Sequence, residues 1–189
     1  MKTDVTFVHP PSIYNFRSRN LRPGPISDVV PSTPVFEMYP IGLISMLNYL
    51  TTRGYDARIS NLAVLMLSSS TFDEEAYLKG LDSDVFGVDL HWLPHVHGAI
   101  NVVRTLKRLH PESKVVLGGY SASYFAEEIM QTYPEVDYVL KGDLQERPML
   151  DLVEYTQGKG DVEDIENLLY RQNGAVKSNK RSNDLKRMD

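Results

Sequence analysis

The chain has 189 residues, of which 42% are hydrophobic, and a formal net charge of −5 at pH 7. A chain of this size can bury one good core, so we expect a single globular unit with a tail. With this net negative charge, the chain lacks the cluster of basic residues that would bind nucleic acids or anionic membranes. No apolar run approaches the roughly 18 residues of a membrane span. Because residues 1–5 also lack the apolar stretch of a secretory signal, we expect a cytoplasmic protein without nucleic-acid or membrane partners.

Cysteine is absent from the sequence. This excludes disulfides, thiolate catalysis, zinc–thiolate sites and iron–sulfur ligation within this polypeptide. Any iron–sulfur chemistry associated with the chain must therefore lie on another domain or another protein.

Short apolar runs alternate with helical patterns along most of the chain. The first run ends at Pro10 and Pro11, and residues 12–39 are polar, rich in proline and unperiodic, which predicts a loop over the site. Strands are expected at 5–9, 57–62, 84–90, 115–117 and 136–140, with residues 63–67 continuing the apolar run after the second. Helices are expected at 41–50, 73–81, 94–109, 122–132 and 145–157. Strict alternation of five strands and five helices predicts a doubly wound α/β fold with a parallel sheet.

The pattern changes after residue 160. Asn173 and Gly174 separate two short alternating runs within residues 168–177, which predicts a β-hairpin packed on the edge of the sheet. The tail at 178–189 is polar and charged, so we expect that the chain continues into a longer protein.

The polar residues that follow the third and fourth strands predict a ligand site. Strand four runs directly into Gly118 and Gly119, where a backbone without β-carbons can approach a bulky ligand. Strand three ends in a polar cluster at 89–97. Carboxyl ends of parallel strands share one edge of a sheet, so both turns are expected to face the same ligand.

Five motifs together resemble a known family. They are the double proline after strand one, the helix start at 40–43 with 53–55 after it, Gly87-Val88-Asp89, Leu117-Gly118-Gly119, and the run 136–143. In this order and spacing, residues 4–176 resemble the amino-terminal cobalamin-binding domain of radical S-adenosylmethionine enzymes.

The resemblance implies a flavodoxin-like five-stranded sheet of order 2-1-3-4-5 with a C-terminal hairpin. Cobalamin would bind at the carboxyl edge, and its nucleotide tail would enter between strands one and three, beside the Gly-Gly turn. The implied cofactor-binding residues are Pro10, Pro11, Ser12, Asp89, Leu90, Leu117, Gly118, Gly119, Tyr120, Gly142 and Asp143, with His91 and Trp92 as further candidates.

The resemblance also implies how the protein is divided. Residues 1–160 would form the cobalamin-binding domain, and residues 161–189 would lead toward a radical S-adenosylmethionine barrel in cis that is absent here. S-adenosylmethionine and an iron–sulfur cluster would bind only in that barrel. The chain alone would carry no catalytic residue and catalyse nothing; in the full enzyme it would serve methyl transfer or another radical reaction.

One departure concerns the lower face of cobalt. Many cobalamin domains carry Asp-x-His-x-x-Gly after the first strand, where the histidine ligates cobalt, but this chain has His9-Pro10-Pro11 there. The run from Asp89 through His91 to Pro94 mimics half of that motif after strand three, with proline in place of glycine. His95 and His97 add no third ligand at useful spacing, so no metal-ligating residue is predicted.

Three other functions remain open. A phosphoacceptor receiver domain would use Asp89 and Lys141, but it also needs carboxylates after strand one to hold magnesium. A flavin carrier would need a phosphate loop rich in Ser and Thr, where this chain has only Ser12. A partner-binding α/β domain without a cofactor is the third alternative.

Overall fold

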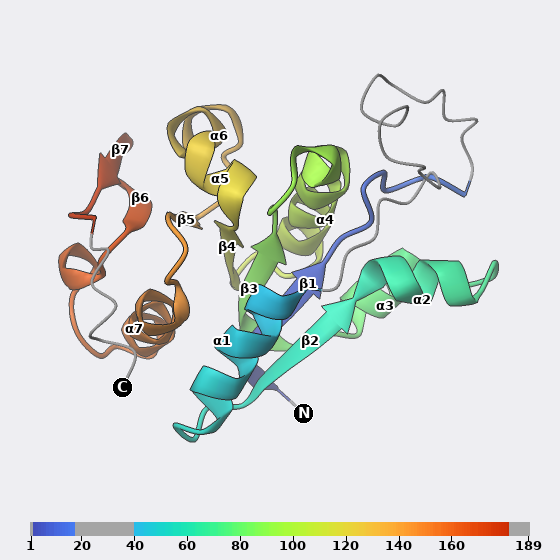
Figure 1. The fold of residues 1–189 in the computed structure, drawn as a ribbon, viewed down its shortest axis with the longest axis horizontal. Coiled ribbons are helices and arrows are strands. Elements are labelled where there is room, and N and C mark those ends of the chain that lie inside the picture. Colours follow the sequence, from blue (N-terminus) through green and yellow to red (C-terminus); the bar gives the residue numbers. More distant parts are fainter. Residues whose placement is uncertain (1, 18–39, 182–189) are drawn as a thin grey trace.

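The computed structural model describes residues 2–17 and 40–181, which form a seven-stranded sheet covered by helices on both faces (Figure 1). The strand order is β2-β1-β3-β4-β5-β6-β7. The strands are β1 (Thr3–His9), β2 (Ala57–Asn61), β3 (Ser83–Asp89), β4 (Lys114–Gly118), β5 (Tyr138–Leu140), β6 (Leu168–Gln172) and β7 (Ala175–Ser178). The expected loop over the site falls largely at 18–39, outside the described residues.

The sheet divides the interior into two apolar cores. One core, around Leu50 and Leu152, lies between the sheet and the helices at 41–51 and 146–156. The other core, around Phe86 and Leu106, lies between the opposite face of the sheet and the remaining helices. The helices are α1 (Ile41–Thr51), α2 (Leu62–Ser68), α3 (Glu74–Lys79), α4 (Val96–Leu109), α5 (Tyr120–Tyr124), α6 (Ala126–Thr132) and α7 (Glu146–Thr156), with 3-10 turns at Leu93–His95 and Val162–Asp164. Within the described ranges, no helix is long and apolar enough to cross a bilayer.

The strand order confirms the doubly wound prediction. β1 to β5 are parallel in the order 2-1-3-4-5, and the chain reverses its winding direction between β1 and β3. The hairpin is confirmed as well, because β6 pairs antiparallel with β5 and β7 pairs with β6. Asn173 and Gly174 both have positive φ, as the predicted tight turn requires. The sheet therefore has seven strands, two more than the parallel five.

Two local expectations are wrong. Leu62, expected to end strand two, instead begins α2, which was not predicted, because the Asn61 side chain accepts a hydrogen bond from the Val64 N–H at 3.0 Å and caps a helix there. The helix expected at 122–132 begins earlier and is split into α5 and α6 at Phe125, whose backbone leaves the helical region.

The chain after β1 lies directly on the start of α4. The Gly98 N–H donates to the Ser12 carbonyl at 3.1 Å, and a β-carbon on Gly98 would lie 1.6 Å from the Pro11 carbonyl oxygen. This contact joins the end of β1 to the helix that follows β3. Only glycine allows so close an approach between two backbones.

Gly98→Ala should therefore lower the free energy of unfolding by ~1–3 kcal/mol, because backbone must move to admit the methyl group. Urea denaturation followed by circular dichroism measures the change. Gly42→Ala is the matched control, since nothing lies within 4 Å of its added β-carbon in α1, and it should leave stability equal or higher. Equal stability of the Gly98 variant and wild type would contradict the contact.

Candidate functional site

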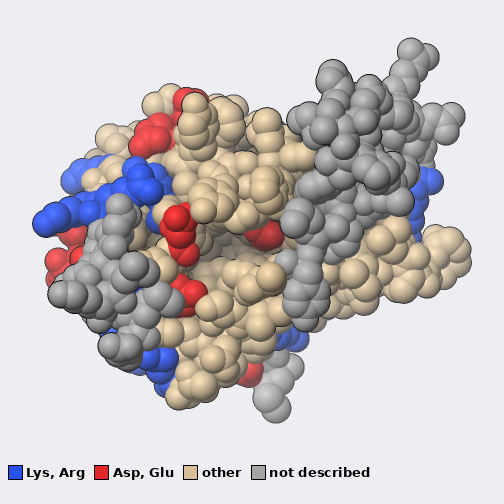
Figure 2. Space-filling view, in the orientation of Figure 1, with Lys and Arg blue, Asp and Glu red and all other residues tan. Residues whose placement is uncertain are grey.

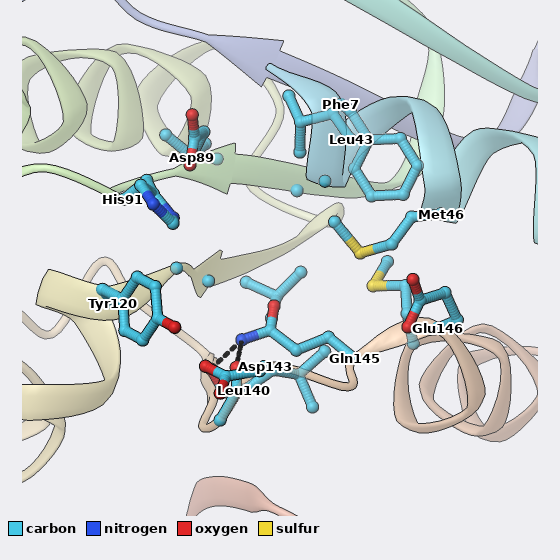
Figure 3. Close-up of a pocket in the computed structure, with 18 residues that line it drawn as sticks. Phe7, Leu43, Met46, Asp89, His91, Tyr120, Leu140, Asp143, Gln145 and Glu146 are labelled. Carbon is cyan, nitrogen blue, oxygen red and sulfur yellow. Dashed lines mark hydrogen bonds between the residues drawn. The ribbon is translucent and has the colours of Figure 1, made fainter. Parts of the chain in front are cut away.

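A cavity of about 160 Å³ opens at the carboxyl edge of the sheet, between α1 and α7 (Figure 3). Its floor is the sheet, through Phe7, Gly87, Val116 and Leu140, and its walls are the two helices, through Leu43, Met46 and Met149. An engineered apolar cavity of roughly 150 Å³ takes up a benzene molecule, so this space admits a ring-sized group. It is the hollow visible in the middle of the space-filling view (Figure 2).

Glycine creates the floor of this cavity. Gly87 lies within β3, paired in register with Phe7 of β1 and Val116 of β4. A β-carbon on Gly87 would lie 2.7 Å from the Phe7 ring, so the ring occupies the space that a side chain would need. The floor is consequently flat and apolar at the point where the winding direction of the sheet reverses.

The turns after β3 and β4 are bonded to each other through their backbones. Leu90 N–H donates to the Gly118 carbonyl at 2.8 Å, and Ser121 N–H donates to the His91 carbonyl at 3.1 Å. Gly119 has a φ of +107°, and a β-carbon on it would lie 2.7 Å from the His91 backbone nitrogen. The paired glycines therefore hold the two turns together and also leave the mouth of the cavity open.

Hydrogen bonds at the start of α7 shape one side of the cavity. The Gln145 Nε2 group donates to the carbonyls of Leu140 at 3.0 Å and Gly142 at 2.8 Å, which fixes the turn after β5. The Ser45 hydroxyl of α1 donates to Glu146 Oε1 at 2.6 Å and bridges the two walls.

A second bridge joins the far ends of the two walls. The Tyr55 hydroxyl, just after α1, donates to Glu154 Oε1 of α7 at 2.7 Å. This hydrogen bond to a carboxylate raises the pKa of the Tyr55 hydroxyl above its ordinary value. The two bridges together set the separation of α1 and α7.

A buried histidine holds the acidic residue at the end of β3. His9 Nδ1 lies 2.8 Å from Asp89 Oδ2, with only 2% of the His9 side chain exposed. The His95 ring stands edge-on to His9 with 5.2 Å between ring centroids. The Asp89 carboxylate is thus fixed by its neighbours at the cavity edge.

The structure brings together part of the predicted site. The predicted residues that line the cavity are Asp89, His91, Gly118, Gly119, Tyr120, Gly142 and Asp143. Leu90 and Leu117 are buried in the core on the opposite face of the sheet. Pro10, Pro11 and Ser12 are also buried, beside α4, and Trp92 is exposed next to the His91 ring.

Several lining residues were missed by the sequence prediction: Phe7, Leu43, Met46, Gln145, Glu146 and Met149. Gly87 carried the available signal, because a glycine inside an apolar strand marks a close approach of another group. The α1 and α7 residues carry no such signal, since their helical pattern shows a buried face without showing what it faces.

The phosphoacceptor alternative is disfavoured by the same contacts. Asp89 is engaged by His9, while Lys141 Nζ contacts Glu127 Oε1 at 3.3 Å and Ser178 Oγ at 3.0 Å. Among the described residues, no group of three or more His, Asp and Glu side chains could hold a metal ion.

Comparisons with known proteins identify the class. Residues 28–147 match the B12 binding domain family, so the chain belongs to that family and is a cobalamin-binding domain. A hopanoid C-3 methylase from Methylococcus capsulatus is 30% identical over 138 residues, which cover 70% of this chain and 25% of that protein. The chain thus spans about a quarter of this relative.

Solved structures show the same fold. TsrM from Kitasatospora setae, a radical S-adenosylmethionine methyltransferase with cobalamin and a 4Fe–4S cluster bound, has a TM-score of 0.70 and 17% identity over 96% of this chain and 29% of its own. OxsB, a cobalamin-dependent S-adenosylmethionine radical enzyme with aqua-cobalamin bound, has a TM-score of 0.66 and 14% identity over 94% of this chain and 22% of its own.

The cavity fits a corrinoid in two respects. Glycines at 87 and 118 leave out side chains that would collide with the Phe7 and Gln145 side chains of its lining, and its apolar walls suit a flat aromatic group. Tyr120, an aromatic residue of the lining, is 58% exposed at the mouth.

The Gly119 contact yields a stability prediction. Gly119→Ala should lower the free energy of unfolding by ~1–3 kcal/mol, because it combines an unfavourable φ with a collision against backbone. Thermal or urea denaturation measures the loss. Gly54→Ala is the control: Gly54 also has a positive φ, +88°, but its β-carbon would meet nothing within 4 Å, so the loss should be less than half as large. Equal losses would show that the turn contact is not what requires glycine.

Proposed function

We propose that this cobalamin-binding domain serves a radical S-adenosylmethionine barrel in the same polypeptide, and that residues 1–189 alone catalyse no reaction. The observation that supports this most is the glycine-floored cavity beside the β1–β3 switch point of a B12-binding family member. The named activities of the relatives, a methylase and a methyltransferase, support methyl transfer as the reaction of the full enzyme. S-adenosylmethionine and the iron–sulfur cluster would bind only in the barrel.

The proposed cofactor contacts follow from the site. The nucleotide tail of cobalamin enters the cavity between α1 and α7, and the Gly118-Gly119 turn passes beside it. Asp89, His91, Tyr120, Gly142 and Asp143 border the mouth. Bound cobalamin supplies a cobalt centre that can carry a methyl group, and this chain binds and orients that cofactor.

The proposed barrel covers the exposed edge of the site. Trp92, Tyr120, Tyr124 and Phe125 are large apolar side chains exposed at the same edge of the sheet. Residues 161–189 would connect residues 1–160 to the proposed barrel, with β6 and β7 of this segment added to the edge of the sheet beside β5. Because the barrel would bury the other side of the corrin, its absence removes contact area and weakens binding.

Cobalamin binding by the folded chain tests the proposal directly. Equilibrium dialysis with hydroxocobalamin should show weak, saturable retention with a visible absorption spectrum, and Gly118→Ala should weaken it roughly tenfold because the new methyl group displaces Gln145 into the cavity. Gly80→Ala, remote from the cavity and in ordinary contact distance of its neighbours, is the matched control. A folded chain that retains no cobalamin at high micromolar concentration would refute the proposal.

A second prediction concerns the lower face of cobalt. His91 lies between the Trp92 and Tyr120 rings, at centroid distances of 5.0 and 4.8 Å, and we expect no histidine nitrogen on cobalt. His91→Ala should therefore leave the paramagnetic resonance spectrum of bound cob(II)alamin unchanged. Nitrogen superhyperfine splitting that disappears in this variant would make His91 the lower ligand.

A further inference from the structure

The Gln145 side chain presents an unused hydrogen-bond acceptor to the cavity. Only 7% of Gln145 is exposed, and its Nε2 group donates to Leu140 and Gly142, which fixes the orientation of the amide. The Oε1 atom consequently faces Gly118, where it would lie 2.6 Å from an added β-carbon. Within the described part of the chain, no group donates a hydrogen bond to this oxygen.

A second acceptor lies on the next residue. Glu146 Oε1 accepts from Ser45, but Glu146 Oε2 is buried without a hydrogen-bond partner in the described structure. Figure 3 shows Glu146 beside Met46, on the wall formed by α7. An acceptor shielded from water in this way costs free energy unless a ligand supplies a donor.

The charges around the cavity restrict what that donor can be. Asp89, Asp143 and Glu146 supply carboxylates, and no Lys or Arg of the described chain lines the cavity. A phosphate in the cavity would therefore meet negative charge without a compensating cation in the lining. The lining instead suits a flat, uncharged group with N–H or O–H donors on its edge.

We infer that Gln145 and Glu146 determine which cobamide binds, by favouring a lower base with an exocyclic N–H donor. The inference rests on the proposed function, since it places the lower base in the cavity between α1 and α7. Adenine carries an amino group on its edge, whereas dimethylbenzimidazole carries two methyl groups and leaves both acceptors unpaired. The ribose hydroxyls are donors common to both cobamides, so the experiment must separate base from ribose.

The test compares three corrinoids: adeninyl cobamide, cobalamin, and cobinamide, which lacks the nucleotide tail. Dissociation constants are measured by equilibrium dialysis for wild type, Glu146→Met and Glu128→Met. Methionine is unbranched, of similar length and without a strong acceptor, and Ser45 is exposed, so its hydroxyl can turn to water. Glu128 is an exposed residue of α6 and matches the change in charge. Circular dichroism checks the fold of each protein.

We expect the ratio of the cobalamin to the adeninyl cobamide dissociation constant to fall roughly tenfold in Glu146→Met and to stay unchanged in Glu128→Met. The free energy of detaching the lower base from cobalt depends on the cobamide and not on the protein. It therefore cancels when the ratio of dissociation constants is compared between wild type and variant. Cobinamide affinity should be the same in all three proteins.

Two results would overturn the inference while leaving cobalamin binding intact. An unchanged ratio in Glu146→Met would show that the base is not recognised there. Equal weakening of both cobamides, with cobinamide unaffected, would assign the acceptor to the ribose. Failure of folded wild type to retain any of the three corrinoids would instead refute the proposed function itself.

Discussion

The backbone contact between the turns after β3 and β4 is the constraint on which the site depends. Hydrogen bonds from Leu90 to Gly118 and from Ser121 to His91 keep both strand ends at the same level. The contact requires a residue without a β-carbon at 119, in a φ region that side chains disfavour. Because the two ends are level, Asp89, His91 and Tyr120 come to one edge beside the cavity.

The cavity remains open because hydrogen bonds between α1 and α7 fix the separation of the two helices. Two hydrogen bonds join the helices: Ser45 to Glu146 near the first turns, and Tyr55 to Glu154 near the last turns. On the cavity floor, Gly87 leaves out a side chain that would otherwise collide with the Phe7 ring. Protein interiors pack densely, so a void of this kind needs such supports.

Local patterns predicted the elements of the fold better than the walls of the site. Apolar periodicity and turn residues predicted the alternation of strands and helices and the Asn173-Gly174 hairpin, because each depends on neighbouring residues alone. The strand order came from the family resemblance, since it depends on contacts between distant segments. The 62–68 helix was missed because one Asn61 side chain decides between helix and strand for an apolar run. Gln145 and Glu146 were missed because their role depends on which face of the sheet α7 covers, a property set by the crossover connections.

The polar residues at the carboxyl edge of the sheet are hydrogen-bonded to other residues of the domain, and their positions are therefore fixed before a ligand binds. His9 holds Asp89, Gln145 holds the turn after β5, and Ser121 holds the carbonyl of His91. Fixed polar groups of this kind orient a ligand with little loss of conformational entropy on binding. Positioning is the property that a cofactor-binding domain needs, since the reactive chemistry belongs to the cofactor and the protein supplies binding and orientation.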